Sequence, residues 1–124
     1  MKNDKPFSLQ ARLKSFVYAY EGIKLFLRAE PQALMHLVAA VSVIAAGCYF
    51  NINWHEWIAI AFAIGMVVVS EILNTAIEKI TDMVSPEINN KAKAVKDLAA
   101  GAVLVASITA LVIGLIVFLP KLME

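Results

Sequence analysis

Residues 98–119 read LAAGAVLVASITALVIGLIVFL, a run of 22 residues without a charged side chain. A helix of this length, at about 1.5 Å of rise per residue, crosses the ~30 Å hydrocarbon layer of a bilayer. Residues 33–50 also lack Asp, Glu, Lys and Arg, and residues 57–77 carry Glu71 as their single charge. The sequence therefore predicts an all-α integral membrane protein with three transmembrane helices, over 33–50, 57–78 and 98–119.

The composition supports a membrane protein. Of the 124 residues, 60% are hydrophobic and 17% are charged, an apolar share above that of an ordinary soluble domain. The first apolar run begins near Ala33, behind a long charged segment, so we do not expect a cleavable signal peptide. The net charge of +1, without a concentrated basic face, gives no reason to expect a nucleic-acid partner.

The segment before the first span, residues 8–28, has the pattern of an amphipathic helix. Its apolar residues recur at helical spacing, and they are Leu9, Leu13, Phe16, Val17, Tyr20, Ile23 and Leu27. Such a helix can lie at the membrane surface or dock on a soluble partner. We favour the surface position because three spans follow, and Pro31 then ends or bends the helix.

The distribution of Lys and Arg predicts the orientation. Ten of the eleven positive charges lie before the first span or between the second and third spans. The ten are Lys2, Lys5, Arg12, Lys14, Lys24, Arg28, Lys79, Lys91, Lys93 and Lys96. The positive-inside rule places both segments in the cytoplasm and the carboxyl terminus outside, in a multi-pass protein of the cytoplasmic membrane.

A polar stripe follows the second span. Glu71, Asn74, Glu78 and Asp82 are separated by steps of three, four and four residues, which place them on one helical face. An ionised side chain inside a membrane costs at least ~2.5 to 3.5 kcal/mol, so it faces a partner, water or a functional site. Glu71 alone could be a structural carboxylate bonded to a neighbouring helix. Three carboxylates on one stripe instead indicate a nearby cation, and oxygen ligands suit Mg²⁺.

The depth of the stripe indicates which reactants could meet there. Glu71 lies eight residues, or roughly 12 Å, below Lys79, near the level of the hydroxyl of a tail-anchored lipid alcohol. ATP can approach from the cytoplasm, where the pair Lys96-Asp97, with Lys93 one turn earlier, could neutralise phosphates. That pair could also be an ordinary helix start with an anchoring lysine. Neither a P-loop nor a protein-kinase signature occurs in the sequence.

Two other classes of function compete with phosphoryl transfer. An intramembrane acid such as Glu71 can serve as a proton relay in a small proton-coupled transporter or channel. The small residues Ala102, Ala106, Ala110 and Gly114 recur at four-residue spacing and could form the packing surface of a scaffold protein. We favour the kinase because the polar stripe continues from Glu71 to the cytoplasmic edge.

Two motifs in register resemble the small prokaryotic membrane diacylglycerol kinase and undecaprenol kinase family. They are EILNTAIE over residues 71–78, followed by Asp82, and KDLAAGAVL over residues 96–104. The resemblance covers nearly the whole chain and includes Tyr18, Gly22 and Glu30. It implies a single membrane kinase domain over residues 1–124 and a homotrimer whose active sites are shared between subunits.

The resemblance also implies roles for individual residues. Glu71 would be the general base that takes the proton from the lipid hydroxyl, and Glu30 and Glu78 would hold the magnesium ion bound to ATP. The residues implied for the ATP site are Tyr18, Glu30, Asn74, Glu78, Asp82, Lys96 and Asp97.

The lipid substrate is predicted from finer features. After Glu30 many undecaprenol-type members read RNFRIH, whereas this chain reads PQALMH over residues 31–36, so only His36 matches. His36 and the AAGAVL run over residues 99–104 look more like the undecaprenol branch than the diacylglycerol branch. We therefore expect undecaprenol as the substrate in preference to diacylglycerol.

Overall fold

The computed structural model describes residues 6–124, and every regular element within them is a helix. The four helices are α1 (Leu9–Ala29), α2 (Pro31–Tyr49), α3 (Trp54–Val84) and α4 (Asn90–Leu122). The all-α prediction is confirmed. Lys2 and Lys5, which the charge pattern assigns to the cytoplasmic side, lie outside the described residues.

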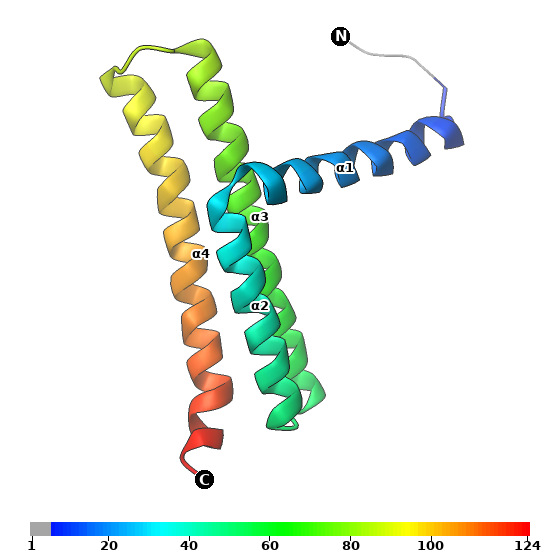
Figure 1. Cartoon of the computed structure of the whole chain (residues 1–124), viewed down its shortest axis with the longest axis vertical. Helices are drawn as coiled ribbons and strands as arrows, with labels where there is room; N and C mark the ends of the chain where they lie inside the picture. Colours follow the sequence, from blue (N-terminus) through cyan, green and yellow to red (C-terminus); the bar gives the residue numbers. More distant parts are fainter. Residues whose placement is uncertain (1–5) are drawn as a thin grey trace.

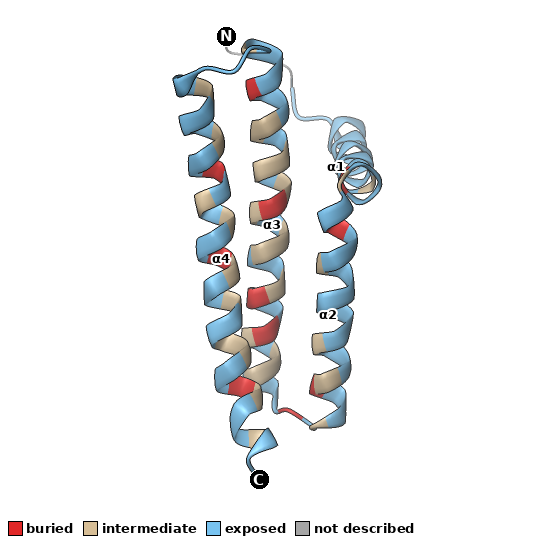
Figure 2. Ribbon diagram, turned by 60° about the vertical axis from the view of Figure 1, so that its left-hand side comes forward, coloured by how far each residue is buried: buried red, intermediate tan, exposed pale blue. Residues whose placement is uncertain are grey.

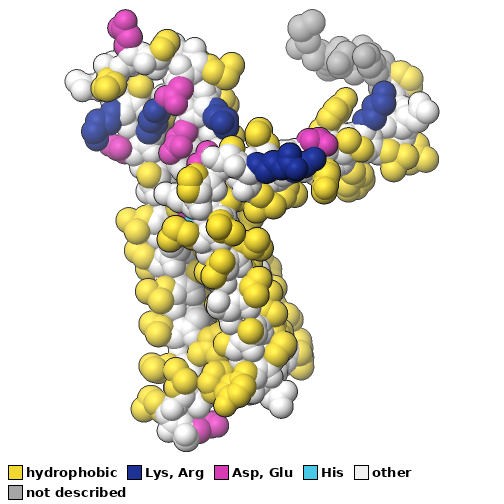
Figure 3. Space-filling view, in the orientation of Figure 1, with side chains coloured by type: hydrophobic (Ala, Val, Ile, Leu, Met, Phe, Trp, Pro, Cys, Tyr) yellow, Lys and Arg dark blue, Asp and Glu magenta, His cyan; other side chains and the backbone are white. Residues whose placement is uncertain are grey.

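Three of the helices form an elongated bundle. α3 and α4 pack against each other as an antiparallel pair, and α2 runs beside α3 (Figure 1). α2, α3 and α4 are each long and apolar enough to cross a membrane, which confirms the prediction of three spans. Hydrophobic side chains dominate the face of the spans shown in Figure 3, as a surface facing acyl chains requires.

The α2–α3 turn is held by a small apolar core. Ile52, Ile60 and Val117 are buried together where the turn meets the end of α4. Gly47 faces this core, and a Cβ atom placed there would lie 2.6 Å from Cη2 of Trp57. The glycine therefore allows the Trp57 ring to pack directly against the α2 backbone.

Polar contacts secure the same end of the bundle. The Asn53 side chain accepts the backbone N–H of Glu56, and the Glu56 carboxylate accepts the backbone N–H of Asn53, which makes a capping box at the start of α3. The same Glu56 oxygen lies 3.4 Å from Nζ of Lys121, near the end of α4. One carboxylate thus caps α3 and links it to α4.

At the opposite end, α3 and α4 extend beyond the spans expected from hydropathy. α3 continues six residues past 78 to Val84, and α4 begins at Asn90, eight residues before 98. Residues 85–89 alone connect them, so Lys79, Lys91, Lys93 and Lys96 lie on helices and not in a loop. Hydropathy marks where a helix leaves the hydrocarbon layer, whereas the helix itself continues until a cap such as Asn89.

α1 projects sideways from the bundle (Figure 1). Its bounds are within one residue of the helix predicted over 8–28, and Ser8 caps its start. In Figure 3 the Lys and Arg side chains of this arm lie on the side of the α3–α4 connection, and hydrophobic side chains lie on the side of the spans. A helix at the cytoplasmic surface of a membrane requires this polarity.

Burial is concentrated between α3 and α4, whereas α2 is mostly exposed (Figure 2). Along the small-residue stripe of α4, Ala106 is buried against the bundle and Ala102 is exposed. Part of the stripe therefore packs within the chain.

Candidate active site

A cleft of about 460 Å³ opens between α2, α3 and α4. One wall comes from α2 and α3 and is polar apart from Met35; its polar residues are Gln32, His36, Glu71, Asn74 and Glu78. The facing wall comes from α4 and consists of Ala100, Val103, Leu104 and Ser107. The cleft therefore offers charged and amide groups on one side and a mainly apolar surface on the other.

Glu71 lies in the cleft wall and pairs with α2. Its side chain is buried, with the residue only 5% exposed, and its Oε1 lies 2.8 Å from Nε2 of His36. An ionised carboxylate can only accept a hydrogen bond, so with Glu71 ionised the donor is Nε2–H of His36. A structural carboxylate would also bond to a neighbouring helix in this way. Glu71 differs because it lies in the wall of a cleft that a reactant could enter.

Asn74 and Glu78 lie on the same wall, closer along α3 to its connection with α4. Nδ2 of Asn74 donates to Oε1 of Glu78 at 3.2 Å, an arrangement that fixes the amide orientation because the reverse would place two acceptors together. Oδ1 of Asn74 is then a buried acceptor without a hydrogen-bond partner in the described part of the chain. An unsatisfied buried acceptor costs about 1–3 kcal/mol and indicates a place for a ligand donor or cation.

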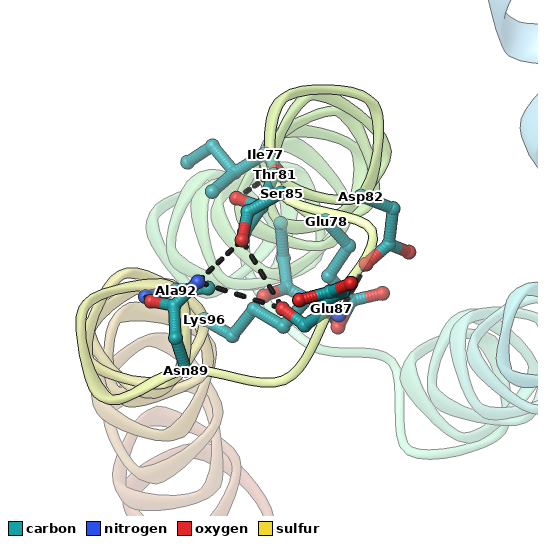
Figure 4. Close-up of polar contacts among 10 residues, drawn as sticks. Ile77, Glu78, Thr81, Asp82, Ser85, Glu87, Asn89, Ala92 and Lys96 are labelled. Carbon is teal, nitrogen blue, oxygen red and sulfur yellow. Dashed lines mark hydrogen bonds and ion pairs between the residues drawn. The ribbon is translucent and has the colours of Figure 1, made fainter.

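A second cluster of charges lies where α3, the connection and α4 meet. Lys96 on α4 reaches across to Asp82 near the end of α3, with 2.5 Å between Nζ and Oδ1 (Figure 4). Lys93 pairs with Asp97 one turn along α4, also at 2.5 Å. These side chains line a hollow of about 260 Å³.

The structure thus divides the predicted polar stripe into two parts. Glu71, Asn74 and Glu78 line the cleft, whereas Asp82 lies in the second cluster with Lys96. Along α3 the eleven-residue step from Glu71 to Asp82 corresponds to about 16 Å. The cation that accompanies Asp82 within the chain is the Lys96 ammonium group.

Two predicted site residues lie apart from these groups. Tyr18 is on the projecting α1, where it is 70% exposed. Glu30 is half-buried at the junction of α1 and α2, outside the residues that line the cleft. Neither residue is therefore among those that line the cleft in a single chain.

The carboxylates fit a magnesium ion that is bound together with a nucleotide. Within residues 6–124 no group of three or more His, Cys, Asp and Glu side chains is close enough to hold a metal ion alone. Mg²⁺ in phosphoryl-transfer sites is usually held by one or two carboxylates together with phosphate oxygens and water. Glu78 and the free Oδ1 of Asn74 supply oxygen ligands of that kind.

The contact between His36 and Glu71 was not predicted from the sequence. The two residues are 35 positions apart, so no helical periodicity relates them. The available signal is that an acid within a span needs a partner, and His36 is the one histidine in the neighbouring first span. Gln32 and Ser107, which also line the cleft, were not anticipated.

An apolar cavity of about 140 Å³ lies next to the cleft, and His36 lines both. The cavity is bounded mainly by small and aliphatic side chains, among them Ala39, Ala40, Ala63 and Ala110. The polar cleft and the apolar cavity therefore adjoin each other at His36.

Comparisons with known proteins match nearly the whole chain. Residues 17–118 match the family described as prokaryotic diacylglycerol kinase. The chain is 42% identical over 109 residues to undecaprenol kinase of Bacillus subtilis, a match that covers 88% of this chain and 89% of that protein. It is 34% identical over 113 residues to a diacylglycerol kinase of Synechocystis, over 90% of this chain and 65% of that protein. A diacylglycerol kinase of Escherichia coli is 25% identical over 100 residues, which cover 81% of this chain and 82% of that protein.

Proposed function

The chain belongs to the prokaryotic diacylglycerol kinase family, and from that premise we propose that it transfers the γ-phosphoryl group of magnesium-bound ATP to undecaprenol. It is a membrane-embedded lipid kinase, since the family and its named relatives are kinases of membrane lipids. The observation that carries the proposal is the buried Glu71 in the wall of a cleft formed by α2, α3 and α4.

Glu71 is proposed as the general base. The lipid hydroxyl enters the cleft, and the Glu71 carboxylate takes its proton. The alcohol oxygen then bonds to the γ-phosphorus, the bond from that phosphorus to the bridging oxygen breaks, and ADP leaves. Glu71 lies deeper in the spans than Asn74 and Glu78. This position supports a lipid hydroxyl at Glu71 and a nucleotide at the other two residues, nearer the α3–α4 connection.

The nucleotide is proposed to bind along the cytoplasmic part of the same face. Asn74, Asp82, Lys96 and Asp97 contact the nucleotide and its phosphates, with Lys96 supplying positive charge. Tyr18 joins this site from α1. Glu30 and Glu78 would hold the magnesium ion, which neutralises charge on the phosphates.

Undecaprenol is proposed as the substrate, with diacylglycerol next. The relative that is 42% identical is named an undecaprenol kinase. His36 also resembles the undecaprenol branch more than the diacylglycerol branch. The cavity beside His36 has an apolar lining that suits hydrocarbon.

The membrane orientation and the oligomeric state are proposed on the same basis. We place α1 and the α3–α4 connection on the cytoplasmic side of the cytoplasmic membrane and the carboxyl terminus outside. We also propose a homotrimer with shared active sites, because Tyr18 and Glu30 are not brought to the cleft within one chain.

A direct assay tests the function. Protein purified in detergent is given magnesium, ATP labelled at the γ-phosphate, and either undecaprenol or diacylglycerol at equal mole fraction. We expect labelled lipid with both and a larger kcat/KM with undecaprenol. Absence of transfer to either lipid contradicts the proposal, and proton flux across vesicles without ATP consumption would favour a transporter instead.

A further inference from the structure

His36 occupies a position with two neighbours of different character. Its Nε2 contacts the buried carboxylate of Glu71, and its ring lines both the polar cleft and the apolar cavity. We propose that His36 is the positioning residue of the kinase, which holds Glu71 with one carboxylate oxygen directed at the lipid hydroxyl. This inference rests on the proposed role of Glu71 as the base.

The contact is selective for one oxygen of the carboxylate. His36 contacts Oε1 at 2.8 Å, and Oε2 forms no hydrogen bond with another side chain of the described residues. A carboxylate rotates freely about its last side-chain bond unless a neighbour fixes it. Because Oε1 is held by the imidazole, Oε2 remains the oxygen that can accept a proton from a substrate.

The two residues come from helices that otherwise meet weakly. α2 has few contacts with α3, in comparison with the extensive α3–α4 packing. The bond between His36 and Glu71 therefore also fixes the local separation of the two helices that form the polar wall. A small displacement of a reacting group can lower a rate about 10²-fold, so control of this separation matters for turnover.

His36 keeps its proton throughout the reaction. The proton that leaves the lipid hydroxyl goes to Oε2 of Glu71, and the electron pair left on the alcohol oxygen forms the bond to phosphorus. The Nε2–H of His36 continues to donate to Oε1 as the charge on the carboxylate changes. His36 thus acts through Glu71 and does not touch the nucleotide.

Two amide substitutions differ only in reach and provide the test. In His36→Gln the side-chain amide nitrogen can take the place of Nε2, whereas in His36→Asn the amide is one bond too short. We expect His36→Gln to retain kcat within about threefold and His36→Asn to lose about 10- to 100-fold, both with little change in the KM for ATP. Equal activity of the two variants would overturn the proposal.

A double-substitution cycle separates positioning from general stability. In the Glu71→Gln background, adding His36→Asn should cause no further loss of kcat, because the residue through which it acts is already disabled. Multiplicative losses would overturn the proposal. Each variant is checked for an unchanged thermal unfolding midpoint in detergent, so that folding defects are not counted as losses of activity.

The chain offers a matched control in its other histidine. His55 stacks on Trp54 at the start of α3, at the opposite end of the bundle from the cleft. His55→Asn should keep the parent kcat, and a loss equal to that of His36→Asn would contradict a specific role for His36. If the parent protein transfers no phosphate to any lipid, the proposed function fails, whereas an active parent with an active His36→Asn variant contradicts only this inference.

Discussion

Glu71 combines two properties that rarely occur together at one residue. It is buried within a helix that crosses the membrane, and it lies in the wall of a cleft. Burial of a carboxylate is unfavourable unless a partner compensates for the lost water, and His36 is that partner. The cleft gives the same group access to a substrate, which a purely structural carboxylate does not need.

Replacement of Glu71 by Gln should separate binding from chemistry. The amide keeps the size of the side chain but cannot take a proton from the lipid hydroxyl. We expect kcat to fall about 10² to 10⁴-fold, the usual value of general-base assistance, while the Kd for ATP stays near that of the parent. Turnover and nucleotide binding are measured on the same detergent preparation. Parent-like turnover in Glu71→Gln would remove Glu71 from the role of base.

At the scale of residues, the polar stripe on one helix could be predicted from spacing alone. Asn74 donates to Glu78 four positions later, as neighbours on a helical face do. The pairs His36–Glu71 and Lys96–Asp82 could not be predicted in the same way, since they join different helices. Periodicity assigns a residue to a face, but which faces meet is determined by packing.

At the scale of elements, α3 and α4 form the rigid part of the site. Both continue as helices past the spans expected from hydropathy, and Lys96 links them near the connection. Lys96 and Asp82 remain substantially exposed, with side chains 40% and 64% accessible, so their pairing contributes less than about 1 kcal/mol to stability. We therefore expect the pair to position the Lys96 ammonium group for the nucleotide phosphates more than to hold α3 and α4 together.

Exchange of the two charges tests this explanation. Lys96→Met should raise the KM for ATP about tenfold or more, because a cation near the phosphates is lost. The double variant Asp82→Lys with Lys96→Asp restores an ion pair between the helices but moves the positive charge to α3. We expect it to remain impaired in ATP binding with a near-parent unfolding midpoint. Full recovery of activity in the exchanged variant would show that the pair is only a link between helices.

The α2–α3 turn provides a prediction about stability. In Gly47→Ala the new Cβ atom would lie 2.6 Å from the Trp57 ring, so the ring or the α2 backbone must move. Overpacking of this kind costs about 1–3 kcal/mol, and we expect a lower unfolding midpoint in detergent. Gly65→Ala is the matched control, since no atom lies within 4 Å of its added Cβ and alanine favours a helix. Equal midpoints for the two variants would contradict the packing described for Trp57.

At the scale of the whole molecule, the positions of the charges agree with one orientation. The charged side of α1 and the charged ends of α3 and α4 lie toward the same end of the bundle, and the hydrophobic surface lies below them (Figure 3). The three spans and the surface pattern of α1 could be predicted because the membrane acts on each helix separately, through its length and its apolar face. The positions of Tyr18 and Glu30 relative to the cleft could not, because they depend on contacts beyond one helix.

Labelling of single cysteines tests the orientation. Cys48 is exposed on α2, so it is first replaced by Ala, and a cysteine is then introduced at Glu87 in the connection or at Met123 at the end of α4. In intact cells a membrane-impermeant maleimide should modify Met123→Cys and leave Glu87→Cys unmodified until the membrane is opened. The reverse pattern would invert the topology, and permeabilised cells serve as the control for reactivity.

The junction between α1 and α2 has a mechanical consequence. Glu30 is the single residue between the two helices, and its backbone is extended, with φ −110° and ψ 115°. With α1, a helix of 21 residues, in the plane of the lipid headgroups as proposed, a change in its tilt would reach α2 through this one residue. We therefore expect a strongly curved micelle and a flat bilayer to hold the Glu30 carboxylate at different angles to the bundle.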